Sequence, residues 1–216
     1  MDYRRDSINW QETKNDVTID CSLDIAVHAA ESDTILLTVP GVDGSLNGYQ
    51  DKYVKIAESV QDEHSAAVVR MENPFITSFH WDSNIRRALD YIQDNAKSIC
   101  GSDSFNLVIM GHSAGASVVA HIAWEYPFIT RLLLTNPAVD LQFDKIVHGL
   151  QEFGGNKITI LIGDKDDAMT NLDEIIKIDE SHRMRTIVLE GVDHDFSGKA
   201  GMDMFLSAPH AHLFSG

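Results

Sequence analysis

Phe105-Asn-Leu-Val-Ile-Met110, Gly111-His-Ser113-Ala-Gly115 and Ala116-Ser-Val-Val119 follow one another directly and form the stretch that decides the fold. The apolar run before Gly111 is too short for most helices, and small and β-branched residues follow Gly115 at near-helical spacing. The pattern predicts a buried strand, a sharp turn and a helix. Ser113 is therefore a candidate nucleophile, because the flanking glycines allow the close backbone approach that such a turn requires.

Apolar strands alternate with amphipathic helices along the rest of the chain. We expect strands at 17–20, 23–29, 34–39, 66–71, 130–135, 157–162 and 185–189, and helices at about 51–62, 82–99, 116–126, 143–153 and 171–180. The first two strands read as an antiparallel entry to the sheet. The alternation predicts an α/β fold with a mostly parallel central sheet and helices on both faces. With 216 residues, the chain suits a single domain, 1–216, and the segment between Thr135 and Lys157 is too short for a lid domain.

Acidic residues and a histidine follow two of the later strands. Asp164, Asp166 and Asp167 come after one strand, and Asp193, His194 and Asp195 come after the last one. Sites in parallel sheets gather at the carboxyl ends of the strands, where Ser113 also lies. A serine nucleophile needs a base and an orienting acid, and both residue types are present there.

Composition limits the classes of partner. The formal charge of −16 disfavours nucleic acid and anionic membranes, because the field of the protein repels phosphates. Cys21 and Cys100 suggest neither a disulfide framework nor a cysteine-rich zinc site. No apolar run resembles a signal peptide or a membrane span, so we expect a cytoplasmic location. The oligomeric state does not follow from the sequence.

Taken in order, these motifs resemble those of the α/β-hydrolase superfamily, over nearly the whole chain. The matching segments are Gly-His-Ser-Ala-Gly at 111–115, Leu-Ile-Gly-Asp-Lys-Asp-Asp at 161–167 and Leu-Glu-Gly-Val-Asp-His-Asp-Phe at 189–196. The resemblance, to small lidless esterases and dienelactone-hydrolase-like members, implies that Asp166 is the acid and His194 the base. The alternative acids are Asp164, Asp167 and Asp140, and the alternative histidines are His182, His210 and His212. The pair His210 and His212 could also suggest a metal site. Because no clear carboxylate partner accompanies the pair, we expect both histidines to be surface residues.

The oxyanion hole and substrate pocket rest on weaker signals. Ala114, at the start of the helix, offers one backbone amide, and the resemblance places the second donor on Val42, in the loop Pro40-Gly-Val-Asp-Gly44. Asp43 either forms a turn before Gly44 or recognises a cationic substrate group. Phe75, Phe79, Trp81 and Phe196 either line an acyl pocket or cover an edge of the core. We expect His112 to pack under the turn.

The resemblance implies a serine hydrolase that cleaves a carboxylic ester or thioester of a small-molecule acyl substrate, with an acyl-enzyme on Ser113. No metal or organic cofactor is required for this chemistry. Two alternatives stay open: an amide or C–C bond hydrolase with the same three residues, and a catalytically silent hydrolase-fold protein that binds a ligand or partner.

Overall fold

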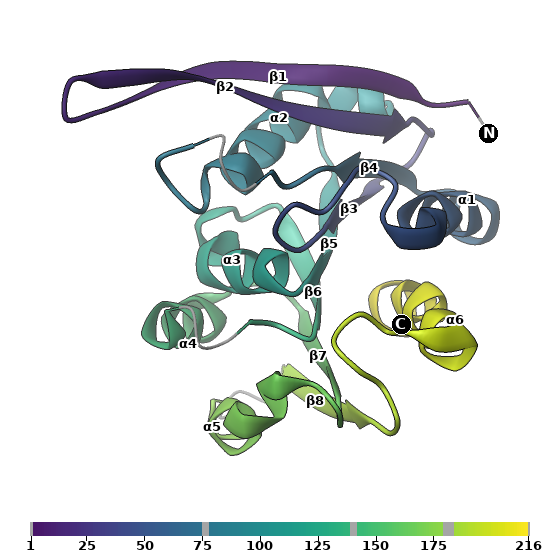
Figure 1. Ribbon diagram of the computed structural model, residues 1–216. Helices are drawn as coiled ribbons and strands as arrows, with labels where there is room; N and C mark the ends of the chain where they lie inside the picture. Colours follow the sequence, from purple (N-terminus) through teal and green to yellow (C-terminus); the bar gives the residue numbers. More distant parts are fainter. Residues whose placement is uncertain (1, 75–77, 139–141, 179–183, 216) are drawn as a thin grey trace. The chain divides into compact units, whose positions relative to one another are not determined.

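The computed structural model describes residues 2–74, 78–138, 142–178 and 184–215, and the chain divides into two compact units, Met1–Asn106 and Leu107–Gly216. Both units combine a sheet with helices (Figure 1). The expected single domain over 1–216 stays a prediction. Among the described helices, none is long and apolar enough to cross a membrane.

The described part of the first unit, residues 2–74 and 78–106, holds four strands and two α-helices. The elements are β1 (Arg4–Lys14), β2 (Val17–His28), β3 (Thr34–Val39), α1 (Lys52–His64), β4 (Ala67–Met71) and α2 (Ser83–Cys100). The strand order is β1-β2-β4-β3, in which β3 and β4 are parallel and the other two pairings are antiparallel. The crossover from β3 to β4 contains α1, and Figure 1 shows α1 and α2 on opposite sides of these two strands.

The prediction of two short strands at 17–20 and 23–29 is wrong, because β2 runs without interruption through Cys21 and Ser22. Cys21 and Leu23 are buried while Ser22 and Asp24 are exposed, which is the alternation of one half-buried strand. The strand β1 was not predicted at all. It pairs with β2 along its whole length around a two-residue turn, Asn15-Asp16, whose residues both have positive φ, as a tight hairpin requires.

Four parallel strands lie in the part of the second unit that the structure describes. The elements are β5 (Asn106–His112), α3 (Ala114–Ile122), β6 (Ile129–Thr135), α4 (Phe143–Glu152), β7 (Lys157–Gly163), α5 (Leu172–Lys177), β8 (Met184–Leu189) and α6 (Gly198–Pro209). Their strands run in the order β5-β6-β7-β8, and α6 lies on the opposite side of them from α3, α4 and α5 (Figure 1). The mostly parallel α/β arrangement with helices on both faces is therefore confirmed. The helix α6 was not predicted.

The core of the second unit explains why its strand ends are well placed. The central strands β5, β6 and β7 are buried along nearly all of their length, with Ile109, Leu133 and Ile160 at most 1% exposed. Burial on both faces holds parallel strands in register, so the loops at their carboxyl ends start from fixed positions.

Candidate active site

Ser113 stands on a strained turn between β5 and α3. Its backbone has φ 56° and ψ −130°, a combination that non-glycine residues rarely adopt. The amide N–H of Ser113 donates to the Thr135 carbonyl at 3.0 Å, which ties the turn to the end of β6. A Cβ on Gly111 would lie 2.8 Å from the Cα of Ala116, so only glycine lets α3 approach the strand this closely. The structure thus has the sharp turn that the sequence predicts.

Asp166 follows β7 in a tight loop that holds its carboxylate in place. Its backbone N–H donates to the Gly163 carbonyl at 3.0 Å, and its Oδ1 accepts a hydrogen bond from the Ala168 amide at 2.6 Å. Only 3% of the side chain is exposed. One carboxylate oxygen is therefore held by the loop while Oδ2 is available to a second donor.

The other candidate acids are placed differently. Asp164 is exposed and its Oδ1 accepts from the Gly191 amide at 2.8 Å, so it links two loops. Asp167 is exposed at the start of a short 3-10 helix, Asp167–Asn171. Asp140 lies outside the described residues, as does His182 among the alternative histidines. Of the described candidates, Asp166 is the one hydrogen-bonded to His194.

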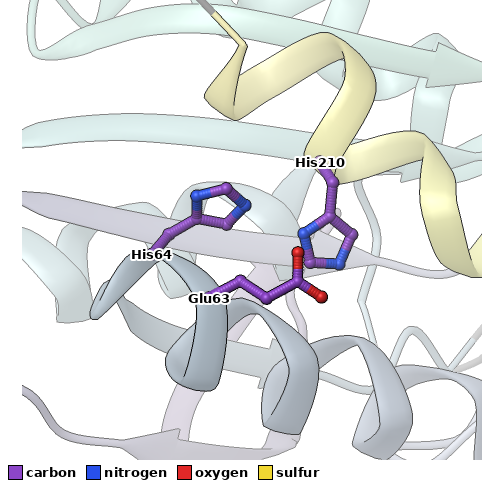
Figure 2. A group of neighbouring side chains, drawn as sticks. All are labelled: Glu63, His64 and His210. Atoms are coloured by element: carbon purple, nitrogen blue, oxygen red, sulfur yellow. The ribbon is translucent and has the colours of Figure 1, made fainter.

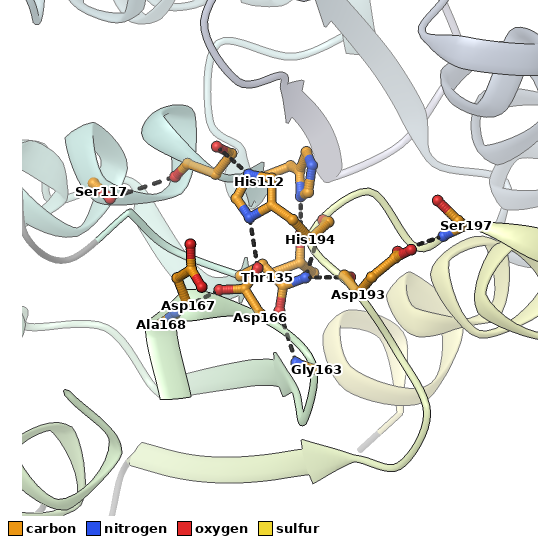
Figure 3. A network of polar contacts seen from close by, with 12 residues as sticks. His112, Ser117, Thr135, Gly163, Asp166, Asp167, Ala168, Asp193, His194 and Ser197 are labelled. Carbon is orange, nitrogen blue, oxygen red and sulfur yellow. Dashed lines mark hydrogen bonds and ion pairs between the residues drawn. The ribbon is translucent and has the colours of Figure 1, made fainter. Parts of the chain in front are cut away.

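His194 connects Ser113 and Asp166 through its two ring nitrogens. Nδ1 lies 2.5 Å from Asp166 Oδ2, and Figure 3 labels both residues. Nε2 lies 2.8 Å from Ser113 Oγ. Since an ionised carboxylate can only accept, Nδ1 carries the proton and Nε2 is left to accept the proton of the serine hydroxyl. Almost half of the His194 side chain, 47%, is exposed, so solvent and small molecules reach the imidazole. The line serine, histidine, carboxylate has the geometry of a nucleophile, its base and an orienting acid.

A cluster of ring side chains packs against His194. The His112 ring lies 5.4 Å from the His194 ring, and the Phe205 ring packs edge-on against His112 at 5.6 Å. Phe196 is fully buried, with its ring 5.0 Å from that of Phe205 and 6.1 Å from that of His112. The expectation of Phe196 as a pocket wall is corrected: burial places it in the packing under the site, which is the alternative that the sequence left open.

His112 also makes a polar contact that fixes its ring. Thr135 Oγ1 donates to the Gly111 carbonyl at 3.0 Å and lies 3.2 Å from His112 Nδ1. Because the hydroxyl proton is already used, the hydroxyl oxygen accepts from a protonated Nδ1 of His112. The ring is only 6% exposed, as expected for a residue that packs beneath the turn.

The loop that carries His194 begins with a second ionised group. Asp193 Oδ1 accepts a hydrogen bond from the Ser197 amide at 2.8 Å. This backbone hydrogen bond lowers the pKa of Asp193, because it stabilises the carboxylate form. Asp193 thereby closes the turn that leads from His194 into α6.

Ala114, the predicted first oxyanion donor, is the first residue of α3, and the other remaining predicted site residues belong to the first unit. Val42 is 48% exposed, and Asp43 has φ 55° in a turn that the Gly44 amide closes by donating to the Gly41 carbonyl at 3.0 Å. The turn-forming alternative for Asp43 is thus observed. Trp81 is half-buried just before α2, and Phe79 donates its amide to Glu12 at 2.6 Å. Phe75 lies outside the described residues. The second oxyanion donor at Val42 and the pocket residues Asp43 and Trp81 stay predictions.

His210 and His212 follow α6 in the C-terminal turn. Burial and the nearby cations Lys157 and Arg185 lower the pKa of His212, because they disfavour its protonated form. Figure 2 draws His210 with Glu63 and His64 of α1. Since His210 belongs to the second unit and the other two residues to the first, no cation site is assigned to them.

Comparison with solved structures decides the fold. Est1E from Butyrivibrio proteoclasticus superposes with a TM-score of 0.67 at 14% identity, covering 96% of this chain and 99% of that one. A dienelactone hydrolase from Anabaena variabilis gives 0.65 at 14% identity and 97% coverage of both chains. An esterase from Pyrococcus furiosus gives 0.69 at 11% identity, with 97% and 90% covered. The chain has the α/β-hydrolase fold. No family model matches the sequence, and no curated protein does.

Within this α/β-hydrolase fold, sequence reasoning missed Asn136. The pair Asn136-Pro137 reads as a chain break after β6, and that break is present. The side chain of Asn136, however, is fully buried and reaches the loops that carry Asp166 and His194. The available signal was its position, because it is the first residue after a buried parallel strand, as Ser113 is.

Proposed function

We propose that the protein is a serine hydrolase that cleaves a carboxylic ester or thioester through an acyl-enzyme on Ser113. The observation that carries the proposal is the hydrogen-bonded line from Ser113 Oγ through His194 to Asp166 Oδ2, with distances of 2.8 and 2.5 Å. The α/β-hydrolase fold, shared with esterases and a dienelactone hydrolase, supports hydrolysis as the reaction class.

In the first step, Ser113 Oγ attacks the acyl carbon while its proton passes to His194 Nε2. Asp166 holds Nδ1–H, which keeps the ring in the correct tautomer and stabilises the imidazolium that forms. The Ala114 amide, at the first residue of α3, donates to the oxyanion, and Val42 is the proposed second donor.

Collapse of the tetrahedral intermediate breaks the bond to the alcohol or thiol, which takes the proton from His194. A water molecule then attacks the acyl-enzyme, gives its proton to Nε2 and releases the carboxylic acid, and Ser113 recovers its proton. Apart from substrate and the attacking water, the proposed cycle is carried out by side chains and backbone amides of this chain.

The test is intact-mass analysis after treatment with a fluorophosphonate, which reports an activated serine without knowledge of the substrate. We expect one adduct on the native protein and none on Ser113→Ala. The adduct should form at least about 100-fold more slowly on His194→Ala, because the base is missing. Ser207→Ala and His148→Ala are matched controls, since both residues are exposed on helices away from the line of three side chains. An adduct that persists in Ser113→Ala would overturn the proposal.

Substrate class is tested by comparing an ester, a thioester and an amide of the same acyl group. Est1E has been seen with ferulic acid bound, so a feruloyl ester belongs in the panel beside short aliphatic esters. We expect turnover of the ester and thioester. Faster turnover of the amide would favour the amidase alternative, and an unreactive serine in folded protein would favour a silent binding protein.

A further inference from the structure

Asn136 is the first residue after β6 and is held rigidly by its backbone. Its side chain and backbone are fully buried, and its amide N–H donates to the Leu161 carbonyl of β7 at 2.8 Å. The residue has φ 44°, in the left-handed region, which asparagine tolerates better than most residues. The start of the side chain is therefore fixed between two neighbouring strands.

The side-chain amide joins two further segments. Nδ2 donates to the carbonyls of Asp193 and His194, at 2.9 and 3.0 Å, and Oδ1 accepts from the Gly163 amide at 2.8 Å. Both protons of Nδ2 and one lone pair of Oδ1 are thus used. This set of contacts assigns the orientation of the amide, because two carbonyls can be matched only by the NH₂ group.

These contacts reach the loops of two of the three hydrogen-bonded residues Ser113, His194 and Asp166, namely those of His194 and Asp166. The two carbonyls belong to the peptide units on both sides of the His194 residue, and Gly163 is the residue whose carbonyl accepts from the Asp166 amide. A single buried side chain thus holds the loop of the histidine and the loop of the carboxylate to the end of β6. Thr135, the preceding residue, accepts the Ser113 amide at 3.0 Å, so the serine turn is anchored at the same strand end.

We propose that Asn136 is the positioning residue that sets His194 against Ser113 and Asp166. The proposal rests on the proposed function, because it concerns the reaction of Ser113. Asn136 touches no reacting atom. It acts by fixing the backbone of the His194 loop, and a displacement of about 1 Å in such a geometry is enough to slow a reaction by about 100-fold.

Asparagine combines two properties that this position requires, a side-chain NH₂ donor and tolerance of a positive φ. Aspartate has the same shape but no N–H, so its carboxylate would face two carbonyl oxygens in a buried setting. Glycine accepts the positive φ without strain but has no amide. Asn136→Gly therefore removes all three side-chain hydrogen bonds without straining the backbone, whereas Asn136→Asp removes the two that Nδ2 donates and keeps an acceptor for the Gly163 amide.

The experiment measures the rate of fluorophosphonate adduct formation and the hydrolysis of p-nitrophenyl butyrate for both variants. It also records the downfield proton resonance of the His194–Asp166 hydrogen bond. Ile160→Ala is the matched control, because it leaves a cavity in the middle of β7 without touching either loop. We expect this variant to lower stability without displacing the carbonyls of Asp193 and His194, to which Asn136 Nδ2 donates.

We expect Asn136→Gly to lose about 10- to 100-fold in the adduct rate and in kcat, with KM changed much less. The downfield resonance should shift or broaden. Asn136→Asp should lose at least as much, and Ile160→Ala should retain both the rate and the resonance at an equal or larger loss of thermal stability.

A folded Asn136→Gly variant with native rates and a native resonance would overturn the positioning role. If circular dichroism shows that Asn136→Gly does not fold, the same criteria apply to Asn136→Asp. A native protein that forms no adduct would contradict the proposed function instead. In that case the resonance of His194, compared between native protein and variant, still decides whether Asn136 positions the ring.

Discussion

His194 Nε2 lies 2.8 Å from Ser113 Oγ although 81 positions separate the two residues in the chain. The contact exists because the parallel strands β5 and β8 end at the same edge of the sheet, where the segments that carry Ser113 and His194 begin. The orientation of the imidazole in this contact is set from its other side, by the buried carboxylate of Asp166.

Asp166→Asn is expected to lower kcat by about 1,000-fold while the protein stays folded. The asparagine keeps an oxygen for the Ala168 amide and turns its NH₂ group toward His194 Nδ1, which favours the tautomer with the proton on Nε2. That tautomer cannot accept the Ser113 proton. Steady-state hydrolysis of p-nitrophenyl butyrate measures the loss. Asp164→Asn, at the exposed neighbour, is the control and should retain nearly full activity; equal losses in both variants would contradict the role of Asp166.

Gly111→Ala is expected to destabilise the protein by about 2 kcal/mol. The added Cβ would lie 2.8 Å from Ala116 Cα and 3.1 Å from its nitrogen, and backbone atoms cannot move aside as a flexible side chain can. Urea unfolding measures the free energy difference. The control is Gly154→Ala, because a Cβ there meets nothing within 4 Å, and this variant should be neutral or slightly stabilised.

Two buried threonines on neighbouring strands should respond in opposite directions to replacement by valine. Thr135 Oγ1 donates to the Gly111 carbonyl and contacts His112, so Thr135→Val is expected to cost about 1–2 kcal/mol. Thr159 is equally buried, but its hydroxyl has no hydrogen-bond partner among the residues that the structure describes.

Removing that unmatched hydroxyl in Thr159→Val should therefore stabilise the protein by up to about 1 kcal/mol. Thermal or urea unfolding of the two variants side by side checks both signs. Destabilisation of the same size in both would mean that the Thr159 hydroxyl has a partner.

Stability should fall on acidification from pH 6.5 to 4 because of His28. Burial, together with the adjacent Arg70 guanidinium, lowers the pKa of His28 to about 4, and its Nε2 accepts from Arg70 Nε at 2.9 Å. Between these pH values the unfolded chain binds a proton at His28 that the folded chain does not, so the free energy of unfolding rises with pH across this window.

The contribution of His28 amounts to about 3 kcal/mol at most. Urea unfolding at a series of pH values measures it, with His28→Gln as the reference for all other groups, since glutamine offers Arg70 an acceptor that does not titrate. Parallel stability curves for the two proteins between pH 4 and 6.5 would rule out this role of His28.

The second unit was largely readable from the sequence. The strands near 106–112, 130–135 and 157–162 carry apolar runs, because a parallel strand covered on both faces has no polar side. The strand near 185–189 is less buried and carries the shorter apolar run 187–189. Ser113, Asp166 and His194 could be selected as candidates because each lies in the segment after such a run, and because the resemblance to the α/β-hydrolase superfamily implies their roles. The first unit was harder, since β1 alternates only between exposed and half-buried residues and its signal is weak.

The site was readable only in part for a similar reason. Asn136 carries a strong local turn signal, Asn before Pro, and that signal accounts for the residue without any reference to its side chain. Phe196 was interpreted from its place beside His194, but its burial depends on Phe205 in α6, a helix whose sequence pattern did not predict it.

By itself, the sequence determined the fold class, the sharp turn at Ser113 and the residue types at three strand ends, because period, length and glycine spacing are local properties of the chain. The resemblance to the α/β-hydrolase superfamily implied Asp166 among the three aspartates, and the geometry agrees in that Asp166 Oδ2 meets His194 Nδ1. Tertiary structure alone decided which nitrogen of His194 faces Ser113, and that the Asn136 amide joins the loops of Asp166 and His194. These contacts depend on the relative positions of loops that are far apart in sequence. The packing of β5, β6 and β7 sets those positions.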